Sequence, residues 1–192
     1  NTFSNESLIR KLETFGATAW LSDISEWVWY TDEEQSRNLR RRGKAISREM
    51  AGVGLKKFVQ QRYEKTILAP LRGELSRMSE PHSIREVLDR GKPYLPWQGA
   101  RGEMALSVGK AVWLYEKGVD GIIDISPFTC MNGIVSESVY PRLSKDHDGI
   151  PIRIFYFDGT SVDLENELAV FMELVAGYNR RKKRRRTPGR AA

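Results

Sequence analysis

Residues 118–132 read GVDGIIDISPFTCMN, an apolar run that ends in a turn and carries the only cysteine of the chain, Cys130. The apolar part, residues 121–125, predicts a short strand. Gly133 permits a tight turn, and residues 134–144 predict a helix. Ligands of open α/β sheets bind where strands end and helices begin. We therefore expect any chemical site of this chain to lie at Cys130.

A lone cysteine in this position has two interpretations. Amide groups at a helix N-terminus favour a thiolate, which is the form that binds metals and acts as a nucleophile. A free cysteine can equally be a small buried apolar residue. The two histidines, His82 and His147, lie far from Cys130 in the sequence, so the spacing indicates neither a zinc site nor a Cys/His pair. The segment Asp146-His147-Asp148 reads as an ordinary turn.

Predicted helices and short apolar strands alternate around this segment. Alternation of this kind is typical of a parallel sheet with right-handed crossovers, and hence of the α/β class. The predicted helices cover residues 4–15, 103–117 and 162–178, and the predicted strands cover residues 17–21, 121–125 and 152–157.

A helical insertion interrupts the α/β pattern. Thr31 with Glu34 and Ser83 with Glu86 match capping boxes, which predict helices beginning at these two points. The predicted organisation is an α/β domain over residues 1–30 and 92–179, a helical insertion over residues 31–91, and a basic tail over residues 180–192.

The formal net charge of +6 comes from the tail. Residues 180–186 are all Lys or Arg, and Arg190 follows them. Without these eight residues the chain has 23 basic and 25 acidic residues. The tail repels itself, has no apolar residues for a core and is predicted to be disordered. No aromatic residue interrupts the basic run, so we do not expect selective binding of nucleic acid.

Composition also restricts the class of protein. One cysteine excludes an internal disulfide and favours a reducing compartment, so we expect a cytoplasmic protein. No apolar run is long enough to cross a bilayer, and the N-terminus lacks the layout of a signal peptide. We expect no membrane partner.

Several motifs resemble the 2-hydroxyacyl-CoA dehydratase superfamily, and in particular the C-terminal part of the large CoA-substrate-specific enzyme activase-like proteins. The resemblance is carried most specifically by SPFTCM at residues 126–131, and further by GVDGII at 118–123, GIPI at 149–152 and FDG at 157–159. It extends to Ser25-Glu26-Trp27 and to Gly102-Glu103.

The resemblance implies a flavodoxin-like, three-layer α/β domain that contributes to ATP-driven electron transfer. Cys130 matches the position of one ligand of an iron-sulfur cluster, and Phe128, Met131 and Glu103 are expected beside the cofactor. The implied partners are an ATPase activase portion of the same or another chain and an acyl-CoA substrate, with a homodimer as a further option. Members of the family carry a strand before the region matching Asn1, so we expect a fragment that lacks its first strand.

The chain departs from the family pattern because the other cluster cysteines are absent. One thiolate cannot hold a cubane cluster, so the cofactor is expected only in a full-length protein, and this chain alone is expected to be inactive. Two alternatives stay open. One is a non-catalytic protein-interaction domain that docks a partner through Trp27, Trp29, Tyr30 and Trp97; the other is nucleic-acid binding through the basic tail.

Overall fold

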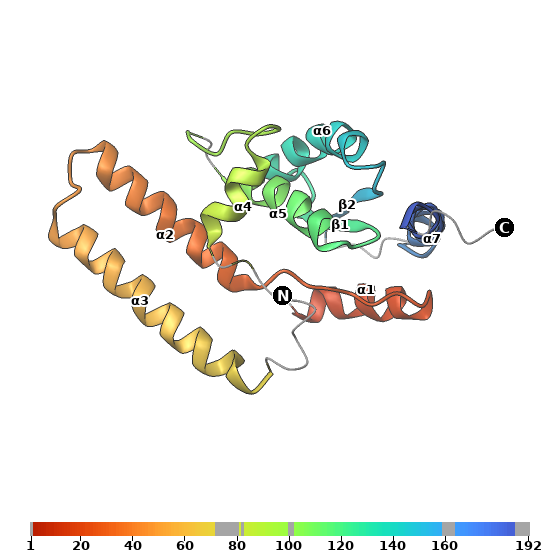
Figure 1. The fold of residues 1–192 in the computed structure, drawn as a ribbon, viewed down its shortest axis with the longest axis horizontal. Helices are drawn as coiled ribbons and strands as arrows, with labels where there is room; N and C mark the ends of the chain where they lie inside the picture. The colour runs from red at the N-terminus through yellow and green to blue at the C-terminus, as the bar shows by residue number, and fades with distance from the viewer. Residues whose placement is uncertain (1, 72–80, 82, 100–101, 159–163, 187–192) are drawn as a thin grey trace. The chain divides into compact units, whose positions relative to one another are not determined.

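The computed structural model describes all residues except 1, 72–80, 82, 100–101, 159–163 and 187–192. It has a mixed α/β fold with two compact units, one formed by Asn1–Ala19 with Val87–Ala192 and the other by Trp20–Glu86. Within the described ranges, no helix has the length and apolar character needed to cross a membrane. Figure 1 labels the helices and strands.

The first unit is built around two parallel strands, β1 (Ile122–Pro127) and β2 (Ile152–Phe157). The register pairs Ile122 with Ile152 and Pro127 with Phe157. Helix α6 (Met131–Asp146) connects the two strands, as parallel pairing requires a crossover. The predicted strand over 121–125, the predicted helix over 134–144 and the predicted strand over 152–157 are confirmed apart from their ends.

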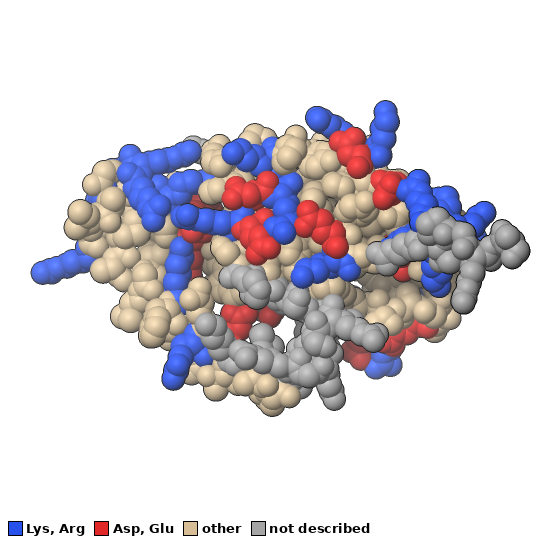
Figure 2. Space-filling view, in the orientation of Figure 1, with Lys and Arg blue, Asp and Glu red and all other residues tan. Residues whose placement is uncertain are grey.

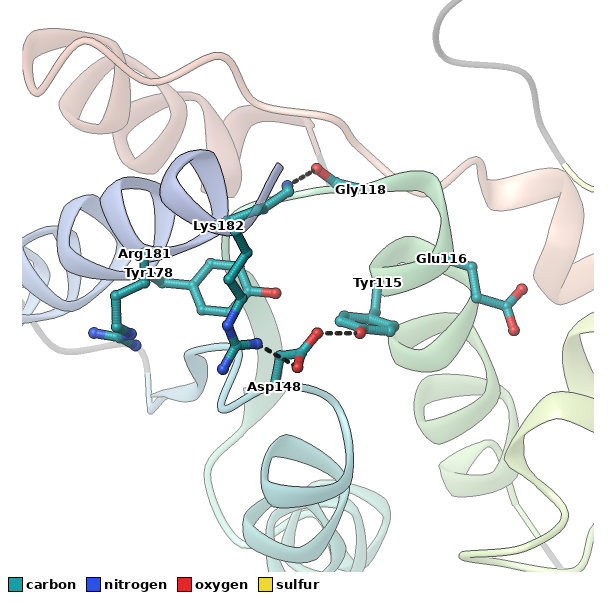
Figure 3. A pocket seen from close by; sticks show the side chains of 8 residues that line it. Tyr115, Glu116, Gly118, Asp148, Tyr178, Arg181 and Lys182 are labelled. Carbon is teal, nitrogen blue, oxygen red and sulfur yellow. Dashed lines mark hydrogen bonds and ion pairs between the residues drawn. The ribbon is translucent and has the colours of Figure 1, made fainter. Parts of the chain in front are cut away.

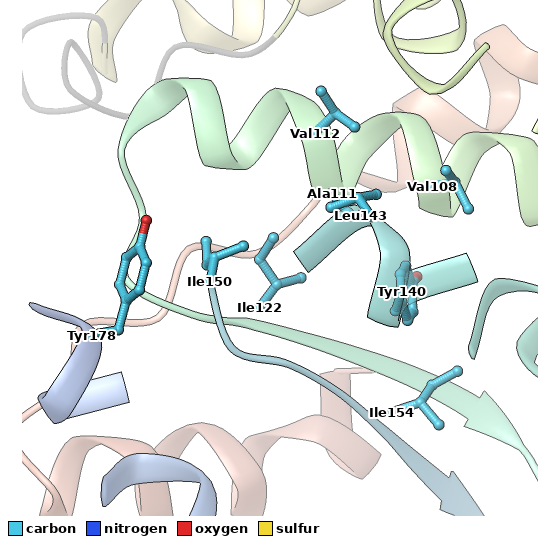
Figure 4. Packing of buried hydrophobic residues seen from close by; sticks show 9 residues of the cluster. All are labelled: Val108, Ala111, Val112, Ile122, Tyr140, Leu143, Ile150, Ile154 and Tyr178. Carbon is cyan, nitrogen blue, oxygen red and sulfur yellow. The ribbon is translucent and has the colours of Figure 1, made fainter. Parts of the chain in front are cut away.

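Helices cover both faces of this sheet. One buried cluster joins the strands to α5 (Met104–Lys117), α6 and the end of α7 (Leu164–Arg186). Its members are Val108, Ala111, Val112, Ile122, Tyr140, Leu143, Ile150, Ile154 and Tyr178 (Figure 4). The other cluster packs Phe155 of β2 against α1 (Thr2–Thr14) and the beginning of α7, through Leu8, Leu164, Leu168 and Phe171. The neighbouring strand residues Ile154 and Phe155 therefore pack into the two different clusters, because successive side chains of a strand point to opposite faces of the sheet.

The second unit contains α2 (Ile24–Arg41), α3 (Arg48–Leu68) and a short 3-10 turn (Ala69–Leu71). Polar contacts join the two long helices: Lys56 Nζ lies 2.7 Å from Asp32 Oδ1, and Lys57 Nζ lies 3.1 Å from Glu33 Oε2. Helix α4 (Ile84–Gly91) begins in this unit and continues into the first. In the first unit, Gly109 of α5 lies directly against Val87, where a Cβ would come within 2.3 Å of the Val87 carbonyl oxygen.

The strand predicted over residues 17–21 is wrong. Gly16 has a φ of 77°, and residues 17–23 have no regular secondary structure. Asp23 then caps α2, where its carboxylate accepts a 2.9 Å hydrogen bond from the Ser25 amide. A strand needs a neighbour to bond its backbone, and β1 and β2 in the described part of the chain pair with each other.

The predicted start of the insertion at Thr31 also differs from the structure. Residue 31 lies inside α2, which begins seven residues earlier at Ile24, so the aromatic residues at 27, 29 and 30 are helical. The hydroxyl of Thr31 donates to the Val28 carbonyl at 2.8 Å instead of capping a helix. Asp23 is the cap that the sequence analysis missed.

The prediction of a disordered tail is wrong for residues 180–186, because α7 continues to Arg186. Lys182 donates hydrogen bonds to the carbonyl oxygens of Gly118 and Val119 and to Asp120. Arg185 forms an ion pair with Asp148. These contacts hold the basic run against the ends of α5 and α6, whereas residues 187–192 lie outside the described residues.

Candidate functional site

The turn that contains Cys130 connects the end of β1 to the start of α6. The Phe128 amide donates to the Phe157 carbonyl at 2.9 Å, so parallel pairing continues one residue past Pro127. The Cys130 amide donates to the Pro127 carbonyl at 3.1 Å, which closes the turn. Cys130 is the N-cap residue of α6, and its carbonyl accepts from the Ile134 amide at 3.2 Å. The thiol thus lies at a strand end and a helix start, as the sequence predicts.

The backbone of Thr129 is strained. Its φ is 67°, in the left-handed region that a β-branched residue seldom adopts. Such a conformation costs about 1–2 kcal/mol and persists only when the surrounding structure enforces it. The residue immediately before Cys130 therefore carries a strain that marks this turn as a candidate functional site.

Gly133 lets α6 approach the end of β1. A Cβ on this residue would lie 2.2 Å from Ser126 Oγ and 3.3 Å from Tyr156 Cε1. The turn needs glycine here because space is lacking, since Gly133 does not have a positive φ. The sequence indicated Gly133 as a residue that permits a tight turn, whereas the structure requires glycine there for lack of space.

Exposed apolar side chains surround the thiol. Cys130 itself is partly buried, whereas Phe128 is 62% exposed and Met131 is 71% exposed. Phe128 stacks edge-on against Tyr156, with ring centroids 6.5 Å apart. Two of the predicted cofactor-binding residues, Phe128 and Met131, thus flank Cys130 on the surface.

Tyr156 and Glu137 add a polar pair to this surface. The Tyr156 hydroxyl donates to Glu137 Oε2 at 2.7 Å. Burial, the bond to Glu137 and neighbouring negative charge raise the pKa of Tyr156 to about 12. The hydroxyl remains protonated at neutral pH.

The residue before Glu103 approaches the first turn of α6. Gly102 has a φ of 99°, and a Cβ on it would lie 2.3 Å from the side-chain oxygen of Asn132. Glu103 occupies the N-cap position of α5 but makes no capping hydrogen bond with its side chain. The structure therefore brings Gly102 against Asn132 in the first turn of α6, two residues after Cys130.

Asp124 and Tyr140 form a buried pair that the sequence analysis missed. The Tyr140 hydroxyl donates to Asp124 Oδ2 at 2.5 Å. Burial raises the pKa of Asp124, although the bond from Tyr140 opposes that shift, and burial also raises the pKa of Tyr140 well above its ordinary value. The sequence feature that could have indicated this pair is Asp124, a single carboxylate inside the apolar run IIDIS at residues 122–126.

At the turn before α6, the sulfur of Cys130 is the candidate metal ligand. Among the residues that the structure describes, no group of three His, Cys, Asp or Glu side chains is placed to hold a metal ion. Cys130 can supply one ligand of a cluster from its partly exposed position, but a [4Fe–4S] cluster takes four thiolates. The chain has no other cysteine, so by itself it could supply one thiolate corner of such a site.

Comparison of the chain with protein-family models, with curated proteins and with solved structures finds no match.

Proposed function

We propose that this chain is the C-terminal domain of a protein like the CoA-substrate-specific enzyme activases and 2-hydroxyacyl-CoA dehydratases, and that Cys130 contributes one thiolate to an iron-sulfur cluster in the full-length protein. The carrying observation is the position of Cys130 at the start of α6, partly exposed and directly after a strained residue. A structural cysteine has no need of this setting. A metal ligand needs access, and amides at a helix N-terminus stabilise its thiolate.

The surroundings of Cys130 support a covered cluster. Phe128 and Met131 are large, apolar and mostly exposed, so another protein surface that brings the missing ligands would also bury them. An apolar shell around a metal site keeps water away and tunes its reduction potential. When complete, the cluster would accept and pass on single electrons. In such a site, Cys130 would supply a ligand atom, and Phe128 and Met131, once covered, would exclude water.

The proposal includes a flavodoxin-like sheet with a further strand, of which this chain would hold only part. A sheet of two strands is marginally stable, and each strand of the described sheet has one edge without a partner strand. A strand added along the open edge of β1 would satisfy the backbone groups there. Hydrogen exchange of the β1 amides, compared between this chain and the full-length protein, measures that pairing. Equal exchange in both would contradict an added strand.

The test of the cluster is anaerobic purification of the full-length protein, with measurement of iron, sulfide and the visible spectrum. Cys130→Ser removes the ligand while retaining the size of the side chain, and we expect it to lower iron content and abolish or shift the cluster absorption. Ser138→Ala, an exposed change on α6, is the matched control. Unchanged iron content and spectrum in Cys130→Ser would overturn the proposal.

A second candidate is protein interaction, favoured by the outer face of α3. The charged Lys56 and Lys57 pair with α2, while apolar residues of α3 face solvent. The exposed set is Leu55, Phe58, Val59, Tyr63 and Ile67, each at least 40% exposed. The predicted aromatic surface is less uniform, because Trp27 is exposed but Tyr30 is buried. Loss of a partner from pull-downs with Phe58→Asp, but not with Cys130→Ser, would support this candidate.

A further inference from the structure

A second site lies on the first unit, where the basic end of α7 meets the ends of α5 and α6. It is a cavity of about 270 Å³, lined by Tyr115, Glu116 and Gly118 at the end of α5, Asp148 from the loop after α6, and Tyr178, Arg181, Lys182 and Arg185 from α7 (Figure 3). Lys and Arg side chains gather on the surface around the end of α7, on the right of Figure 2. None of these residues belongs to the Cys130 turn.

Tyr178 lines this cavity and carries a polar hydroxyl. The residue is 4% exposed, and its hydroxyl points toward the end of α5 and Tyr115 (Figure 3). Within the described part of the chain, the structure shows no hydrogen bond for this hydroxyl. Burial and the carboxylates of Asp148 and Asp120 raise the pKa of Tyr178, although Arg185 and Arg181 oppose the shift. The group stays protonated at neutral pH and is available as a donor.

Two carboxylates line the cavity, and both are already compensated. Glu116 Oε2 accepts a 2.5 Å hydrogen bond from Arg90 Nε. Asp148 Oδ2 accepts a 2.7 Å hydrogen bond from the Tyr115 hydroxyl, and Asp148 Oδ1 bonds to Arg185. Lys182 is likewise engaged by Asp120 and by two carbonyl oxygens at the end of α5. The negative groups at this site are therefore occupied and leave little capacity for a bound cation.

Among the described residues, no carboxylate compensates the charge of Arg181. Its guanidinium lies 5.9 Å from the centre of the Tyr178 ring, and among the described residues no carboxylate lies within ion-pair distance of it. A guanidinium has five N–H donors, so Arg185 also keeps donors beyond the one that bonds to Asp148. Arg181, Arg185 and the buried Tyr178 all line this cavity, and guanidinium groups match the oxygens of phosphate.

We propose that this cavity binds a dianionic phosphate, either free or as the monoester of a small molecule, through the Tyr178 hydroxyl and the guanidinium groups of Arg181 and Arg185. The volume sits near the low end of ligand pockets, which suits a phosphate with a small organic group. The two tyrosine rings form its apolar wall. The site is independent of the Cys130 cluster.

The test is a titration of the 192-residue chain with inorganic phosphate and with phenyl phosphate at constant ionic strength, followed by amide chemical shifts. We expect saturable shifts at the ends of α5 and α7. Tyr178→Phe removes only the hydroxyl, and a lost hydrogen bond to a charged group weakens binding about tenfold. Arg181→Gln is expected to weaken it by about the same factor. Tighter binding of phenyl phosphate assigns the site to a monoester, and equal binding assigns it to free phosphate.

Two control variants distinguish a specific phosphate site from general electrostatic attraction to the basic helix. Tyr63→Phe changes an exposed tyrosine of α3, and Arg184→Gln removes an exposed charge of α7 outside the cavity. Both are expected to change the dissociation constant by less than about twofold. Equal weakening by Arg184→Gln and Arg181→Gln, or no effect of Tyr178→Phe, would overturn the proposal. Binding of a single-stranded oligonucleotide that tolerates Tyr178→Phe, without saturable binding of either phosphate probe, would assign the basic helix to nucleic acid instead.

Discussion

Gly133 and Ser126 are in direct contact, and this contact sets the distance between α6 and the end of β1. A Cβ on Gly133 would lie 2.2 Å from Ser126 Oγ and 2.6 Å from Ser126 Cβ. No rotation of Ser126 removes the second clash, since the position of Cβ is fixed by the backbone. The start of α6, with Cys130 as its cap, can therefore occupy its place only because residue 133 has no side chain.

We expect Gly133→Ala to lower the free energy of unfolding by about 1–3 kcal/mol, because the helix must shift to relieve the overlap. Urea unfolding followed by circular dichroism measures the change. The control is Gly177→Ala in α7, where the new Cβ meets only the ends of Arg181 at 3.6 Å and Arg180 at 3.9 Å, and which should stabilise by about 0.5–1 kcal/mol. Combining Gly133→Ala with Ser126→Gly should recover much of the loss. If Gly133→Ala alone left the free energy of unfolding unchanged, α6 would pack less closely against the end of β1 than the structure indicates.

The second prediction concerns Lys182, which bonds to the two carbonyl oxygens at the end of α5 and to Asp120. A cation at this end also complements the helix dipole. We expect Lys182→Met, which retains the aliphatic stem, to lower the free energy of unfolding by about 1–3 kcal/mol. Arg184→Met, at an exposed position of the same helix, should have little effect. Equal effects of the two variants would mean that the basic run acts only by its overall charge.

The sequence predicted the parts of the fold whose signal is local. Ile122, Ile123 and Ile125 form an apolar run bounded by turn residues, and the strand appears there. The strand predicted over 17–21 failed because pairing depends on a distant partner, which periodicity does not report. The basic run was misjudged for a similar reason. Its helix is held by Asp120 and Asp148, and their proximity to α7 is a property of the fold.

The candidate site was predictable to a similar extent. The position of Cys130 at a strand end and helix start followed from the order of the elements. The contact between Gly102 and Asn132 could not be predicted, because it joins segments 30 residues apart through a backbone approach. The same holds for the bond between Tyr140 and Asp124. A carboxylate in an apolar strand indicates a partner, but the sequence does not identify which residue it is.

A third prediction concerns pH and Asp124. Burial raises the pKa of this carboxyl group above its ordinary value of 3.8 in the folded chain. The folded state therefore holds a proton that the unfolded state has released, and stability falls as pH rises through this window. Asp124→Asn keeps an oxygen acceptor for Tyr140 but does not titrate. We expect the stability of the variant, relative to the parent, to increase as pH rises from 3.8 toward neutrality.

Urea unfolding of both proteins at several pH values measures this difference, and the other carboxyl groups cancel in the comparison. Ser138→Ala, at an exposed position of α6, is a control that changes no titratable group, so its difference from the parent should not vary with pH. A constant difference between Asp124→Asn and the parent would contradict a raised pKa at this site. A difference that decreases with pH would mean that the folded state favours the ionised carboxylate.

The last prediction tests why Thr129 has a φ of 67°. Glycine adopts this conformation without the steric cost of about 1–2 kcal/mol, although it gains about 0.5–1 kcal/mol of entropy in the unfolded chain. We expect Thr129→Gly to raise the free energy of unfolding by about 0.5–1 kcal/mol. Ser138→Gly, in the exposed middle of α6, should lower it by a similar amount. Destabilisation by Thr129→Gly would show that the turn is not strained.

Thr129→Gly also tests whether the strain at residue 129 serves the proposed role of Cys130 as a cluster ligand. If the conformation of Thr129 fixes the direction of the Cys130 thiol, the relaxed turn of Thr129→Gly holds that thiol less firmly. In the full-length protein we therefore expect Thr129→Gly to be more stable and yet to contain less iron than the parent, because a ligand with more freedom binds its metal less tightly. Higher stability with unchanged iron content would assign the strain to packing of the turn and remove it from the argument for a cluster ligand.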